Sequence, residues 1–223
     1  VWAGRGTTTV EIKNGADGKA ATGPVINAAT VFYAVLTHTN DTNTGSTNIT
    51  IGGGTFTASN AIFQIDSNKN NNTVTTTING GTYTVTNGDA FNISQTAGSV
   101  NANVTINGGT FTASGLGVYV ASGTANVTFN NATVNSQLEV VKSEPASTAL
   151  TLTVLKGTYI STAERVFYAN SATNTVTLGT KGMNNADLIV NTKAASAKQV
   201  IASHKGSDAT LNLTIWGGTY ENR

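Results

Sequence analysis

The sequence predicts an all-β protein, a right-handed parallel β-helix of about seven to eight coils with three strands per coil. Three observations predict this fold. One phrase of eight residues recurs along the chain, a second run of apolar residues follows each copy, and Gly or Asn stands where the chain must turn between strands. A single unit of this kind cannot bury its apolar face, whereas stacked units bury a continuous core.

The repeated phrase ends in Thr-Ile-Asn-Gly-Gly-Thr-Phe/Tyr in its best copies. Clear copies occupy residues 49–56, 76–83, 104–111 and 213–220, and weaker copies occupy 127–134, 152–159 and 176–179. The last Thr recurs at intervals of 27, 28, 23 and 25 residues and then of 61, which fits two coils with an insertion at about 184–196. Because a strand residue advances about 3.3 Å, such a unit is too short for a four-stranded propeller blade and suits one turn of a β-helix.

Alternation of inward and outward residues predicts three buried stacks. The first strand is expected to bury Ile49, Ile51, Thr76, Ile78, Val104, Ile106, Val127, Phe129, Leu152, Val154, Val176, Leu178, Leu213 and Ile215. The second stack is expected from Phe56, Tyr83, Phe111, Val134, Tyr159 and Tyr220, and the third from Phe63, Phe91, Val118, Leu138 and Val200. A short helix at 193–197 is the alternative to strand where Ala and Lys are frequent.

The chain is expected to be one β-helix domain over 1–223, with an irregular first coil or N-terminal cap at 1–46 and regular coils over 47–223. The pattern stops in mid-coil at 216–223 without a polar capping element, and an uncapped β-helix end exposes a strand edge. The sequence is therefore expected to be a fragment of a longer surface protein, followed by further repeats or domains of the same chain.

Composition excludes several classes of partner. Only 10% of the residues are charged and the net charge is +1, so a broad basic face for nucleic acid is not expected. The longest apolar run, 31–36, is too short to cross a membrane, and membrane insertion is not expected. The chain has no Cys and therefore neither a disulfide nor a thiolate zinc site.

The residues that carry enzyme chemistry do not cluster in the sequence. A β-helix enzyme needs carboxylates at equivalent positions of adjacent coils, and the eleven acidic residues are scattered. His38 and His204 are far apart and lack neighbours at metal-ligand spacing. Glu139 and Lys142, with Glu164 and Arg165 one coil later, are expected to form surface ion pairs. The sequence thus predicts a non-enzyme without catalytic residues, cofactor or metal.

The outward positions of the first strand form a pattern of Thr and Asn. The candidate ligand-binding residues are Thr50, Thr77, Asn103, Thr105, Asn126, Thr128 and Thr153, together with Trp216 at a corner. An uncharged ladder of hydroxyl and amide groups suits a glycan chain or ice. It also suits ordinary solvent-facing strand residues that bond across coils. Tyr33 and Tyr168 are further candidates for stacking on sugars.

The Thr-Ile-Asn-Gly-Gly-Thr-Phe/Tyr phrase, followed by a strand of the Val-Phe-Tyr type, resembles the β-helical repeats of large bacterial cell-surface and adhesin-like proteins over residues 30–223. The resemblance implies an extracellular module attached to the bacterial surface that adheres to a glycan or host surface protein, or projects other parts as a stalk. Two alternatives stay open. They are a polysaccharide-active lyase or hydrolase and an ice-binding protein with a flat Thr/Asn ladder.

Overall fold

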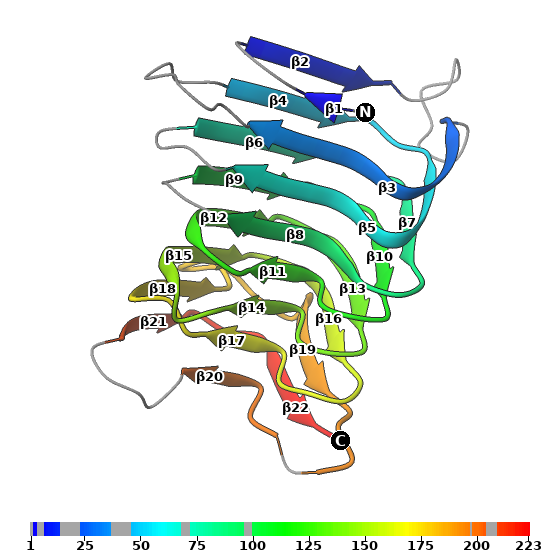
Figure 1. The fold of residues 1–223 in the computed structure, drawn as a ribbon. Coiled ribbons are helices and arrows are strands. Elements are labelled where there is room, and N and C mark those ends of the chain that lie inside the picture. Colours follow the sequence, from blue (N-terminus) through cyan, green and yellow to red (C-terminus); the bar gives the residue numbers. More distant parts are fainter. Residues whose placement is uncertain are drawn as a thin grey trace.

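The protein is a parallel β-helix in which the chain winds through eight successive rungs (Figure 1). The computed structural model describes residues 2–3, 7–13, 23–36, 46–67, 72–95, 100–196, 198–203 and 209–223. Within them all strand pairs are parallel, in one sheet of 14 strands and one of eight, and there is no helix. The chain turns clockwise as it recedes from its N-terminal end, so the helix is right-handed (Figure 1). The predicted fold is confirmed.

The first seven rungs each contribute three strand positions, as predicted, and the described part of the eighth contributes two. The first column, the eight-stranded sheet, contains β2 (Thr7–Ile12), β4 (Ser46–Ile51), β6 (Asn72–Ile78), β9 (Val100–Ile106), β12 (Gly123–Phe129), β15 (Ser147–Val154), β18 (Thr173–Leu178) and β21 (Thr210–Ile215). The second contains β7 (Thr82–Val85), β10 (Thr110–Ala113), β13 (Ala132–Ser136), β16 (Gly157–Ser161), β19 (Leu188–Thr192) and β22 (Thr219–Asn222). The third contains β8 (Asp89–Gln95), β11 (Val118–Val120), β14 (Val141–Ser143), β17 (Phe167–Ala169) and β20 (Ile201–Ser203). In the first two rungs β3 (Val25–Leu36) and β5 (Thr55–Ser67) run through both later columns, and β1 (Trp2–Ala3) pairs with β3.

Aromatic side chains stack along the axis in the upper rungs. The rings of Phe56 and Tyr83 lie 4.9 Å apart between centroids, and those of Tyr83 and Phe111 lie 4.4 Å apart. Phe63 and Phe91 stack at 4.4 Å in the third column. Full burial of such a side chain contributes about 1.5–3 kcal/mol before conformational entropy is counted, so these stacks dominate the stability of the rungs.

The Gly-Gly corner is required by close backbone approach between rungs. Gly54, Gly81 and Gly109 have φ of 131°, 111° and 109°. A Cβ on Gly81 would lie 2.9 Å from the carbonyl oxygen of Gly54 in the rung above. Any other residue would meet both backbone strain and a clash here.

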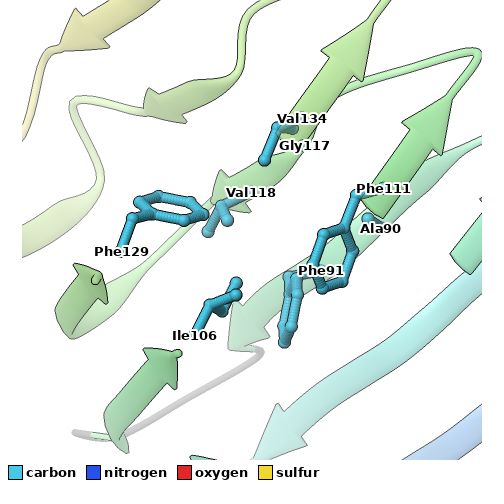
Figure 2. A pocket seen from close by; sticks show the side chains of 8 residues that line it. All are labelled: Ala90, Phe91, Ile106, Phe111, Gly117, Val118, Phe129 and Val134. Carbon is cyan, nitrogen blue, oxygen red and sulfur yellow. The ribbon is translucent and has the colours of Figure 1, made fainter. Parts of the chain in front are cut away.

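The third-column aromatic stack ends at Phe91 of the third rung, which Val118 follows, and the second-column stack ends at Phe111 of the fourth rung, which Val134 follows. Phe129, from the first column, lines the small apolar space beside these two valines (Figure 2). The lining is entirely apolar and does not admit a water molecule. The interior at this level is a packed core and not a ligand cavity.

The predicted inward residues of the first strand are buried from β4 to β18, but Leu213 and Ile215 of β21 are 42% and 47% exposed. Among the described residues β21 pairs only with β18, and no described strand lies along its other edge. Tyr220 is half-buried and packs against the core.

The prediction for Leu138 is wrong, because this side chain is 39% exposed. Leu138 lies in the corner between β13 and β14, and Val141 pairs with Val118 in the third stack. Val200 is half-buried against the core, while Ile201 pairs with Phe167.

The extra residues of the seventh rung lie at 179–187, earlier than the predicted insertion at 184–196, because β19 pairs in register with β16 and β22. Asn185 holds this corner by accepting a hydrogen bond from the amide of Thr180 at 2.8 Å and donating to two carbonyls. The alternative of a helix at 193–197 is not found over 193–196, and residue 197 lies outside the described residues.

Candidate functional site

The Thr and Asn residues predicted as a ladder do form one. Strand register in the first column aligns two outward columns over seven rungs, which together we call the Thr/Asn face. The Thr column consists of Thr50, Thr77, Thr105, Thr128, Thr153, Thr177 and Thr214. The neighbouring column consists of Asn48, Thr75, Asn103, Asn126, Thr151, Thr175 and Asn212.

The geometry of the Thr/Asn face follows from the sheet. Neighbouring strands lie about 4.8 Å apart, and the two columns, two residues apart along each strand, lie about 7 Å apart. The Asn126 amide donates to the Asn103 side-chain oxygen at 2.9 Å, so the side chains also bond along the column. The outward slots of both columns carry no charged residue from β4 to β21. The face therefore offers hydroxyl and amide groups to a neutral ligand.

An Asn ladder continues the face at the adjoining corner. The Asn107 side chain donates to Asn79 at 2.8 Å, and Asn130 donates to Asn107 at 2.5 Å. Trp216 occupies the equivalent corner of the last rung, where it is 44% exposed and the Lys181 ammonium lies 5.4 Å from its ring centroid. The structure therefore places Trp216 at the edge of the Thr/Asn face, in a later rung than the other candidate residues.

A second ordered face, which sequence reasoning did not assemble, lies on the third column. The outward slot at the centre of each of its strands forms what we call the tyrosine column, which runs from the first to the seventh rung. Its residues are Tyr33, Gln64, Asn92, Tyr119, Lys142, Tyr168 and Ala202. Part of this pattern was visible in the sequence, because Tyr33, Gln64, Asn92, Tyr119 and Tyr168 each stand between two inward apolar residues and therefore point outward. Lys142 and Ala202 have an apolar neighbour on one side and Ser on the other.

Ion pairs lie beside the tyrosine column, and of the four residues predicted to pair, Glu164 and Arg165 do so with each other, whereas Lys142 pairs with Glu144. Lys142 pairs with Glu144 at 2.7 Å, and the Tyr119 hydroxyl donates to the same carboxylate at 3.4 Å. Glu164 pairs with Lys198 at 3.0 Å and with Arg165 at 3.5 Å. The side chains of these five charged residues are each only 27–28% exposed. They form a packed network and not a set of freely solvated charges.

Two carboxyl groups beside this network are shifted toward the neutral form. Burial raises the pKa of Glu139, which is only 5% exposed, and the nearby Glu164 carboxylate raises it further, against the opposing pull of Lys142. Burial also raises the pKa of Asp89, although the Leu116 amide donates to its carboxylate at 2.7 Å and Asn92 at 3.1 Å.

Among the described residues, no group of three or more His, Asp or Glu side chains is arranged to hold a metal ion. His38 and His204 lie outside the described residues. The described part of the chain also contains no helix long and apolar enough to cross a membrane.

The fold and its faces define a parallel β-helix solenoid with two ordered outer surfaces, one uncharged and one of tyrosine, amide and paired charges. Comparison with models of known protein families, with curated proteins and with solved structures finds no match.

Proposed function

We propose that this chain is a non-enzymatic binding module of a bacterial cell surface, exported from the cell, whose Thr/Asn face adheres to an uncharged glycan surface. The observation that carries the proposal is the register of the two outward columns over seven rungs. A sheet held by a packed core presents its side chains without further ordering, which lowers the entropic cost of binding. Each rung adds a similar weak contact, so a long chain or a flat surface gains avidity from many rungs.

A screen of the purified chain against host and microbial glycans tests this proposal. We expect retention without release of oligosaccharides, and weaker retention when Thr105 and Thr128 are changed to Val, which keeps their shape and removes the hydroxyl. Thr112→Val is the matched control, because Thr112 points outward from β10, in another sheet. Released oligosaccharides would establish an enzyme instead. An equal loss of retention in Thr112→Val would show that the Thr/Asn face is not the binding surface.

Ice binding is the second candidate, and one observation favours it. The coils differ in length, at 27, 28, 23 and 25 residues between successive Thr positions, yet the strands stay in register. The differences are absorbed in the loops and corners, so the spacing of the Thr column is kept. A thermal hysteresis assay decides this candidate. A freezing-point gap that disappears in the Thr105→Val, Thr128→Val double variant would support it, and no gap in the unaltered protein would exclude it.

A further inference from the structure

We infer that the tyrosine column is a second binding site, separate from the Thr/Asn face, for an extended and uncharged polysaccharide strand running along the helix axis. The two faces belong to different sheets of the protein, so either can bind when the other does not. The strands of the third column face the viewer in Figure 1, with β11, β14 and β17 stacked at its centre.

The spacing of the aromatic rings in the tyrosine column fits an extended sugar chain. Tyr119 on β11, Lys142 on β14 and Tyr168 on β17 follow one another in register. Since parallel strands lie about 4.8 Å apart, the two tyrosines lie about 10 Å apart along the axis. That distance is close to the length of two pyranose units in an extended chain. Alternate sugar rings of one strand would then contact Tyr119 and Tyr168, with Lys142 beside the ring between them.

The side chains above and beside the two tyrosines supply hydrogen-bond donors and acceptors. Gln64 and Asn92 continue the column upward and are joined by a hydrogen bond of 3.4 Å. A sugar ring has an apolar face of C–H groups and a rim of hydroxyls. Aromatic rings suit the apolar face, and amides and paired charges supply donors and acceptors for the hydroxyls. A linear array of both kinds fits a polysaccharide better than a compact ligand.

The cations beside the tyrosine column are paired with carboxylates. Lys142 is neutralised by Glu144, and Arg165 and Lys198 are both paired with Glu164. Each of the three cations therefore has a carboxylate partner, and only one net positive charge remains among the five groups, which is too little to recruit a phosphate or uronate polymer by charge alone. Their hydrogen-bonding groups still serve a neutral ligand. An uncharged glycan is the class of ligand that this balance favours.

The rings of Tyr119 and Tyr168 are held in place by neighbouring cations before any ligand binds. The ammonium of Lys142 lies 5.9 Å from the centroid of the Tyr119 ring, and the guanidinium of Arg165 lies 5.0 Å from that of Tyr168. These contacts fix the orientation of both rings. By contrast, Lys13 and Arg223, elsewhere on the surface, have side chains that are 78% and 75% exposed. A surface ordered before binding loses less entropy when a ligand arrives.

Affinity gel electrophoresis tests the site, with soluble hydroxyethylcellulose and xylan as neutral probes and polygalacturonate as the charged probe. We expect a neutral polymer to retard the protein, and Tyr119→Thr and Tyr168→Thr each to weaken this binding by about tenfold or more. Threonine keeps the strand propensity and removes the ring. Tyr168→Phe, which keeps the ring, should bind as the unaltered protein does, and circular dichroism checks that each variant is folded.

The Thr105→Val, Thr128→Val double variant separates this site from the Thr/Asn face. If the tyrosine column binds, that variant is still retarded, and adding Tyr119→Thr to it removes the remaining retardation, whatever becomes of the proposed function. Failure of every neutral polymer to retard the unaltered protein would overturn the inference. So would unchanged binding in both Tyr→Thr variants, or stronger retardation by polygalacturonate than by the neutral polymers.

Discussion

Thr76 shows how a single atom lowers the stability of an otherwise apolar column. Its side chain is fully buried between Ile49 and Val104, and its hydroxyl oxygen has no hydrogen-bond partner. A buried polar group without a partner costs about 1–3 kcal/mol. The same holds for Thr47, which is also buried and unpartnered.

Thr76→Val is therefore expected to raise the free energy of unfolding by about 1 kcal/mol, because it replaces the hydroxyl by a methyl group of similar size. Urea unfolding measures the change. Thr77→Val is the matched control, since Thr77 is the next residue on the same strand and points outward, and it should change stability by less than about 0.5 kcal/mol. A loss of stability in Thr76→Val would show that the hydroxyl has a partner in solution.

Glu139 links stability to pH. Its pKa is raised in the folded protein, chiefly by burial. The folded state therefore favours the neutral acid. The corresponding stability is fully present below the unfolded pKa, about 4.3, and is lost as the pH rises through the higher folded pKa.

Glu139→Gln removes this loss, since the amide stays neutral at every pH. The free energy of unfolding of the variant should fall less than that of the unaltered protein between about pH 4 and about pH 7. Thermal or urea unfolding at a series of pH values measures the two slopes. Asp89→Asn should flatten the slope in the same direction, because burial raises the pKa of Asp89 too. A variant slope as steep as the original would contradict the assignment.

At the scale of elements, the corners decide where strands begin. Gly81 combines a positive φ with a backbone neighbour in the rung above, whereas Gly182 has a φ of 75° and no atom within 4 Å of the place that a Cβ would take. Both glycines have a positive φ that penalises a side chain, and the φ of 111° at Gly81 lies further from the left-handed helical region than the 75° at Gly182. Only Gly81 faces the clash as well.

Gly182→Ala is expected to cost about 1 kcal/mol, from the backbone conformation alone. Gly81→Ala should cost clearly more, because its new methyl group meets the Gly54 carbonyl at 2.9 Å. The difference between the urea midpoints of the two variants measures the close rung-to-rung approach together with the less favourable φ of Gly81. Equal losses would mean that the corner relaxes to make room.

Sequence patterning predicted strands where apolar alternation is strong and failed at corners of variable length. The inward residues of the first column, such as Ile78 and Val104, were predictable because each copy of the phrase fixes its own register. Leu138 was misplaced because it begins the apolar run 138–141, whose inward residue is the last one, Val141. Seven residues separate Val134 from Val141, just as seven separate Phe111 from Val118. The ion pair between Lys198 and Glu164 could not be predicted either, because Lys198 comes from the next rung and only the fold brings the two side chains together.

At the scale of the whole molecule, stability is transmitted from rung to rung. Each strand pairs only with its equivalents one rung above and below, so every rung is stabilised chiefly by its two neighbours. The change from aromatic stacks to valines occurs between the third and fifth rungs. Phe129 bridges this level, buried at 1% exposure with its ring edge-on to Tyr159 at 5.2 Å.

Phe129→Ala should therefore weaken the rod at its middle. Loss of the ring leaves a cavity and costs about 3–5 kcal/mol. Because coupling runs through nearest neighbours, we expect amide hydrogen exchange to speed up most in β12 and in β9 and β15 beside it, and least in β4 and β6. Phe91→Ala in the continuous aromatic stack is the comparison, since it should shift the region of faster exchange upward to β8 and the strands beside it, β5 and β11. Uniform acceleration in every strand of both variants would mean that the rod unfolds as a single cooperative unit, and that the rungs are coupled over a longer range than their contacts indicate.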